Sequence, residues 1–221
     1  MKIIDDLKPT QIRVLGALLE KEQATPDYYP LTVNALLAAC NQKSNRDPVT
    51  QLSETEVVEA LDSLARDTLV WRSEGARTER WRQSISRRLE LDPEEKAVLT
   101  LLMLRGPQTA GELRSRSTRL HSFTSLAEVE DALRRLTQEG RELVLEMARR
   151  PGQKENRWCH LMAGEPDEES PAPAPGPAAR QRFEGRGDAS DSGLADRVAA
   201  LEAKVEELAL ALERLDSATE I

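Results

Sequence analysis

The sequence is poor in aromatic residues and in cysteine for a chain of 221 residues. It has three Trp, two Tyr and two Phe, so a hydrophobic core must come from Leu, Val, Ala and Ile. Cys40 and Cys159 are too sparse a pair for a disulfide scaffold. A zinc site needs four ligands, and beyond these cysteines only His121 and His160 are left. We therefore expect both cysteines to pack in the interior, and no metal or other cofactor.

The sequence also lacks the patterns of membrane, secreted and catalytic proteins. No uninterrupted apolar run reaches the roughly 18 residues of a membrane-spanning helix. Asp5 and Asp6 lie where a signal peptide would need an apolar stretch, so we expect a cytoplasmic protein. There is no Gly-rich phosphate loop, no Gly-x-Ser-x-Gly elbow and no His-Glu-x-x-His run. We therefore expect a binding protein, not an enzyme.

The net charge of −8 is unevenly distributed along the chain. Residues 1–88 and residues 89–164 each carry equal numbers of basic and acidic side chains. Residues 165–221 hold 6 basic and 14 acidic side chains, which is the whole acidic excess. The charge of the whole chain therefore says little about the partners of residues 1–164.

One pattern of residues occurs twice in the same order. Residues 56–61 (EVVEAL) align with residues 128–133 (EVEDAL), 72 positions later. Further along, Arg80-Trp81 matches Arg157-Trp158 at an offset of 77, so the insertions fall in loops. The repetition predicts one supersecondary unit that is present twice.

Each repeat predicts three helices and then a β-hairpin. Four helices are expected to begin at a capping residue that has Glu three positions later. These pairs are Ser53 and Glu56, Asp92 and Glu95, Thr109 and Glu112, and Ser125 and Glu128. The hairpins are expected within residues 69–84 and 143–161, with Gly in each turn. This order is typical of the winged helix-turn-helix, so the sequence predicts a mainly α protein with small β-hairpins and two such domains, 1–88 and 89–164.

The acidic C-terminal part predicts a linker and a helix. Residues 165–193 are rich in Pro, Ala and Gly and are expected to be disordered. Residues 194–216 carry apolar residues at alternating spacings of four and three, which predicts a coiled-coil helix and a homodimer. The seam consists of Leu194, Val198, Leu201, Val205, Leu208, Leu212 and Leu215. The alternative is an amphipathic helix that packs on the rest of the chain.

Basic side chains in the predicted hairpins favour DNA binding. In winged helices the third helix enters the major groove and the hairpin contacts the backbone or the minor groove. Cationic side chains at these places would contact phosphates. The candidate nucleic-acid contacts are Lys43, Arg46, Arg72, Arg77, Arg80, Arg82, Arg149, Arg150, Lys154 and Arg157. A transcription-regulator-like protein is the leading hypothesis, although the same arginines could form an ordinary solvated surface.

The predicted third helices favour a different kind of partner. Residues 53–67 hold five acidic side chains and one basic side chain, Arg66. In the second repeat Glu128 and Asp131 lie near Arg135. An acidic face repels the phosphates that line a DNA groove. The alternative hypothesis is a protein-interaction scaffold without DNA binding, which resembles in outline the tandem winged-helix accessory subunits of bacterial condensins, by fold analogy only.

Two neighbouring segments carry a family resemblance. Tyr29–Leu36 (YPLTVNAL) and Ala39–Pro48 (ACNQKSNRDP) resemble the YceH-like family of bacterial proteins, and the likeness extends over residues 7–164. The resemblance implies a bacterial cytosolic protein with tandem winged helices, and it implies no ligand. The specific part is a loop dense in side-chain donors: Asn41, Gln42, Lys43, Ser44, Asn45 and Arg46. This loop could bind phosphate or an acidic partner, but capping the second helix and bracing the third is the favoured role.

Overall fold

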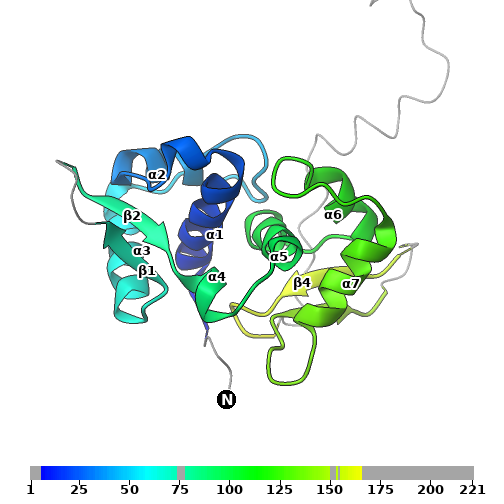
Figure 1. The fold of residues 1–221 in the computed structure, drawn as a ribbon. Coiled ribbons are helices and arrows are strands. Elements are labelled where there is room, and N and C mark those ends of the chain that lie inside the picture. Colours follow the sequence, from blue (N-terminus) through cyan, green and yellow to red (C-terminus); the bar gives the residue numbers. More distant parts are fainter. Residues whose placement is uncertain (1–5, 74–77, 150–152, 154, 166–221) are drawn as a thin grey trace, which may run out of the picture. The chain divides into compact units, whose positions relative to one another are not determined.

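The chain forms three helices and a hairpin twice in succession (Figure 1). The structure is a computed structural model that describes residues 6–73, 78–149, 153 and 155–165. The first half, residues 6–88, contains α1 Pro9–Ala24, η1 Pro26–Tyr28, α2 Val33–Cys40, α3 Glu54–Arg66, β1 Val70–Ser73, β2 Arg80–Gln83 and α4 Ile85–Arg88. The second half, residues 89–165, contains α5 Pro93–Arg105, α6 Ala110–Arg116, α7 Leu126–Leu136, β3 Val144–Met147 and β4 Arg157–His160. The protein is therefore of the mixed α+β class.

The predicted capping residues begin the helices. Ser53, Asp92 and Thr109 each accept a hydrogen bond from the third backbone N–H of α3, α5 and α6, while the Glu at that position bonds back to the cap. For α7, only one of the two predicted capping hydrogen bonds is present. Ser125 accepts from the N–H of Glu128, but the Glu128 carboxylate accepts from the N–H of Thr124 at 2.8 Å instead.

The two hairpins repeat each other in detail. In the first half β1 pairs antiparallel with β2, and in the second β3 pairs antiparallel with β4. Each hairpin also bridges to the residue that precedes the N-cap of the second helix of its half. Trp81 pairs with Leu31, and Trp158 pairs with Gln108. Both residues of the second pair lie 77 positions after their counterparts, so the predicted repetition extends to strand pairing.

The core lies around α1 and α5, which pack side by side (Figure 1). Every residue from Gln11 to Glu20 is buried, and so is every residue from Ala97 to Leu104. A helix that is buried all round must be covered on several sides. α2 and α3 cover α1, while α6 and α7 cover α5, so one continuous apolar cluster spans both halves. Each fully buried Leu in it contributes about 1.5–3 kcal/mol relative to an exposed one.

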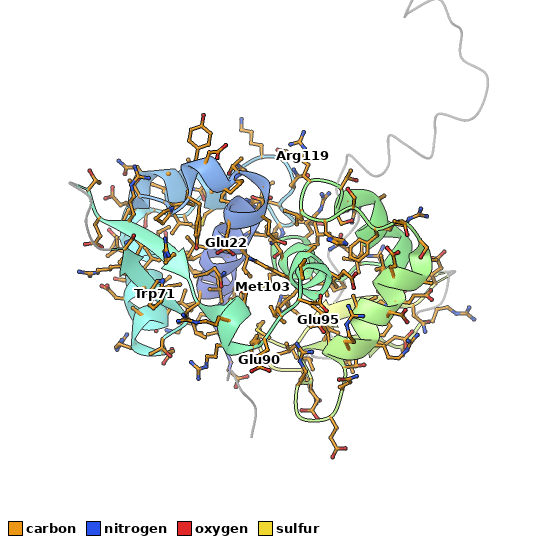
Figure 2. The ribbon with its side chains drawn as sticks, viewed as in Figure 1. Glu22, Trp71, Glu90, Glu95, Met103 and Arg119 are labelled. Carbon is orange, nitrogen blue, oxygen red and sulfur yellow. The ribbon has the colours of Figure 1, made fainter. Side chains whose placement is uncertain are left out.

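Polar contacts also join the two halves. The Gln23 amide donates to Thr100 Oγ1 at 3.1 Å, and Lys96 forms an ion pair with Glu22 (Figure 2 labels Glu22). Together with the shared core, these contacts hold residues 6–165 as one compact unit. Within the described ranges no helix is long and apolar enough to cross a membrane. The predicted linker beyond Glu165 and the seven seam residues lie outside the described residues.

Candidate functional site

Arg46 is a buried structural residue, which corrects its place among the expected nucleic-acid contacts. Its side chain has no exposed surface and donates to both carboxylate oxygens of Glu20, at 2.9 and 2.6 Å. It also donates to the carbonyl of Ala39 near the end of α2. Burial raises the pKa of Glu20, but the hydrogen bonds and charge of Arg46 outweigh this effect and leave the pKa below its ordinary value. Arg46 thus anchors its loop to α1 and caps α2.

Asn41, the first residue of the loop, ties the end of α2 to the segment before α3. The Asn41 amide donates to the carbonyl of Leu52 and accepts from its N–H, both at 2.8 Å, just before α3. The next four residues, Gln42–Asn45, face a cleft between the halves. Among them Lys43 is exposed, so of the two candidate contacts in this loop it alone presents its charge to solvent.

In each hairpin one arginine binds the hairpin to its own half of the chain. Arg80 donates to the carbonyl of Pro30 at 2.9 Å, and Arg157 donates to the carbonyl of Pro107 at 2.6 Å. Arg157 also forms an ion pair with Glu112 at 3.3 Å. Because the two arginines make equivalent bonds 77 positions apart, each has a local structural role that the sequence did not reveal.

Arg72 is neutralised by neighbouring acids. Its guanidinium lies 3.6 Å from Asp62 of α3 and 3.3 Å from Glu79, and 5.1 Å from the centroid of the Trp81 ring. Its side chain is nevertheless 60% exposed, so these pairs are weak and can be exchanged. On the same hairpin Trp71 is exposed under the guanidinium of Arg87 (Figure 2).

Of the remaining candidate contacts, the structure describes Arg82 and Arg149. Arg82 on β2 is half-buried, and its Nε is buried without a hydrogen-bond partner in the described structure. Arg149 is exposed just after β3. The other three, Arg77, Arg150 and Lys154, lie outside the described residues. The two described cations, Arg82 and Arg149, lie at different hairpins.

The outer face of α3 is acidic. Glu56, Glu59 and Asp62 are exposed on it, and Arg66 is the one exposed cation of this helix. A shallow hollow of about 580 Å³ lies between this face and the start of α1, lined on the α3 side by these four residues together with Ala60 and Ser63. A helix with this charge is unsuited to a groove lined with phosphates.

A second groove, of about 680 Å³, runs along α7. We call it the α7 groove; it lies between α6, α7 and the second hairpin. Its lining residues are Ala110, Gly111, Leu126, Glu130, Arg134, Thr137, Glu146, Glu155, Asn156 and Trp158. Leu126 is 41% exposed and Trp158 half-buried, so apolar surface meets solvent beside three carboxylates. The one cation, Arg134, pairs with Asp131 at 2.5 Å.

The sequence did not reveal this groove. Leu126 fits the core spacing of Val129 and Leu133, but it lies at the first position of α7 and stays exposed. Trp158 helped to reveal the repeat, but nothing in the sequence indicated that its side chain is partly exposed. The available signal for the groove was Leu126, a large apolar residue directly after the helix N-cap Ser125.

The cysteines lie in the interior and do not form a site. Cys40 and Cys159 are both free and buried. Burial raises the pKa of Cys40 to about 12, which disfavours the thiolate that a nucleophile or metal ligand needs. Among the described residues no three His, Cys, Asp or Glu side chains are placed to hold a metal ion.

Comparison with known proteins gives the family. Residues 7–153 match the family described as "Protein of unknown function, DUF480". The chain belongs to this family. A UPF0502 protein of Geobacter sulfurreducens is 48% identical over 203 residues, 90% of this chain and 88% of the relative. Another from Geotalea uraniireducens is 52% identical over 174 residues, 78% of this chain and 80% of the relative. The resemblance to an uncharacterised bacterial family is thereby confirmed.

Proposed function

We propose that each half is a winged helix-turn-helix domain and that the protein is a non-enzymatic scaffold that binds another polypeptide. The order of three helices and a hairpin supports the fold, as does the bridge from each hairpin to the segment before the second helix. In such folds the third helix and the hairpin form the recognition surface. The chemistry of that surface therefore decides the kind of partner.

The α7 groove carries the proposal. It lies between the third helix and hairpin of the second half, where a DNA-binding winged helix would have cations. Here Glu130, Glu146 and Glu155 border it, and Leu126 and Trp158 offer apolar surface. Carboxylates repel phosphates, whereas apolar anchors with an acidic rim suit a basic amphipathic peptide. The acidic face of α3 extends the same preference to the first half.

A capture experiment with matched variants tests this proposal. The purified full chain, tagged, is mixed with a nuclease-treated bacterial lysate, and the bound polypeptide is identified and then titrated in pure form. Glu130→Lys with Glu146→Lys is expected to weaken that titrated affinity at least about tenfold, since two charge contacts reverse. Glu139→Lys, an exposed change on the turn after α7, is the control. Equal affinity in all three proteins would refute the role of the groove.

DNA binding through the hairpins is the second candidate. Residues 71–88 hold six arginines against two glutamates, and Arg87 and Arg88 are exposed on α4. Fluorescence anisotropy with a mixed-sequence duplex at about 50 and 200 mM salt tests it. Binding that weakens steeply with salt, and that Arg77→Glu with Arg150→Glu abolishes, would favour DNA. No binding at either salt would remove this candidate.

We also propose that residues 194–216 pair two chains in a coiled coil and that the protein acts in the bacterial cytoplasm. The seam of Val and Leu supports the first statement, and the free, buried cysteines fit a reducing compartment. Light scattering over a concentration series tests the pairing. Native chain is expected to approach twice the mass of the Leu201→Glu, Leu208→Glu variant. A monomer at every concentration would refute the pairing.

A further inference from the structure

A cleft of about 610 Å³ separates the two halves on the side where α1 and α6 end. We call it the basic cleft. Its lining residues are Glu20, Lys21, Ala24, Thr25, Gln42, Lys43, Ser44, Asn45, Leu101, Leu104, Arg116, Arg119 and Leu120. It shares none of these residues with the α7 groove. The volume is within the range of small-molecule sites, about 300–1,000 Å³.

The cleft holds four cations and one carboxylate. Glu20 is already neutralised by the buried Arg46, which donates to both of its oxygens, and Lys21 lies 3.4 Å from it. The Arg116 guanidinium already donates a hydrogen bond to the Gln108 side chain at 2.8 Å and forms an ion pair with Glu112 at 3.4 Å.

Two of these cations are free to bind a ligand. In the described part of the chain neither Lys43 nor Arg119 has a hydrogen-bond or ion-pair partner (Arg119 is labelled in Figure 2). The cleft therefore has a surplus of positive charge, although the charges of residues 1–164 balance. A hollow with walls of low dielectric strengthens the field of such a surplus.

The walls of the cleft are fixed by both halves. Arg105 donates to Asn45 Oδ1 at 3.0 Å, and the N–H of Asp47 donates to the carbonyl of Leu104 at the same distance. Burial lowers the pKa of Arg105, and the nearby charge of Arg116 lowers it further. The loop that carries Lys43 is thus held against α5, which reduces the entropy lost when a ligand binds there.

We infer that the basic cleft binds a small anion that carries two or more phosphate groups. Lys43 and Arg119 would supply the main charge, and Arg116 and Lys21 would add to it. The Ser44 hydroxyl and the Gln42 amide are donors within the same lining. No lining residue is aromatic, so a nucleobase would gain no stacking and affinity would come from the phosphates. This ligand is independent of the polypeptide partner proposed above.

Calorimetric titration of the full chain with inorganic pyrophosphate tests the inference. At about 50 mM salt, where charges are little screened, we expect one site per chain with a submillimolar Kd. The double change Lys43→Glu, Arg119→Glu should weaken binding at least about tenfold. The double change Lys43→Gln, Arg119→Gln should also weaken binding at least about tenfold, although it removes the two positive charges without reversing them. Both positions are exposed, so thermal unfolding should be unchanged. Arg66→Glu, an exposed change on α3 outside the cleft, is the control.

Three outcomes would overturn the inference. One is no binding at millimolar pyrophosphate, and another is equal affinity in the native chain and both double variants. The third is duplex DNA that binds through Lys43 and Arg119 and is not displaced by pyrophosphate. Each of these leaves the capture experiment on the α7 groove unaffected, so failures of the two proposals can be told apart.

Discussion

Gly16 in the middle of α1 lies directly against Leu104 of α5. A Cβ atom added at Gly16 would lie 3.0 Å from Leu104 Cδ2 and 3.3 Å from Met103 Cβ, and Figure 2 labels Met103 in this region. Glycine costs roughly 0.5–1 kcal/mol in a helix interior relative to alanine. Its presence here therefore reflects the close approach of the two helices, which is what joins the two halves.

Replacement of Gly16 by Leu should destabilise the protein. The new side chain has no space between α1 and α5, so we expect a loss of about 1–3 kcal/mol or more in the free energy of unfolding, measured by urea denaturation. Gly111→Ala is the control, because a Cβ there would meet only Thr109 Oγ1, at 3.8 Å. That change should be neutral or mildly stabilising. If Gly16→Leu has no effect, the two helices do not pack this closely.

Removal of Arg46 should be among the most damaging single changes. Arg46→Ala removes both strong hydrogen bonds to the carboxylate of Glu20 and leaves it only the 3.4 Å contact with Lys21, so we expect a loss of about 3–5 kcal/mol in unfolding free energy. Arg46→Lys should recover only part, because an ammonium cannot reproduce the two-pronged contact. The double change Arg46→Met, Glu20→Leu should recover more, because it removes both charges of the buried pair. If the losses of Arg46→Met and Glu20→Leu, measured singly by urea denaturation, add up to that of the double change, the pair is not coupled.

Local features of the fold could be predicted from the sequence. A cap such as Ser53 and its partner Glu56 lie three positions apart, so their bond depends on the helix alone. The repeat was visible because core positions such as Leu61 and Leu133 keep one offset. The hairpins followed from the same register, and the structure confirms that each lies after the third helix of its half.

Long-range relationships could not be predicted. Arg46 was expected on a binding surface because its loop is polar, but its role depends on Glu20, 26 positions earlier and brought near by the packing of α1. The basic cleft likewise joins Lys43 to Arg119, which lie in different halves. Their proximity follows from the packing of α1 on α5, and no local pattern indicates the partner of a helix that is buried all round.

The equivalent arginines of the two hairpins should each contribute to stability. Arg80→Ala and Arg157→Ala each remove a charged donor from a proline carbonyl, so we expect losses of about 1–2 kcal/mol in unfolding free energy. Arg66→Ala, an exposed change, should stay within about 0.5 kcal/mol. Because Arg80→Ala is expected to destabilise the protein, any loss of DNA binding in this variant must be compared with that of a control variant of equal stability. Arginine variants as stable as the native protein would remove the structural role of these bonds.

His160 should make stability depend on pH in a weakly acidic range. The residue ends β4 half-buried, and its Nδ1 is buried without a hydrogen-bond partner in the described structure. Burial lowers the pKa of His160 from 6.5 to about 4. Between these values the unfolded chain binds a proton that the folded chain does not. The stabilisation from neutral His160 is therefore complete above pH 6.5 and is lost as pH falls toward about 4.

Replacement of His160 by Phe isolates this effect, because Phe is similar in shape and does not titrate. We expect the native protein to lose on the order of 2 kcal/mol more unfolding free energy than His160→Phe between pH about 7 and about 4. Urea denaturation across that range measures both proteins, and the difference cancels the carboxylates that they share. Parallel pH curves would mean that His160 takes up its proton equally in the folded and unfolded states, and so is not held neutral by burial.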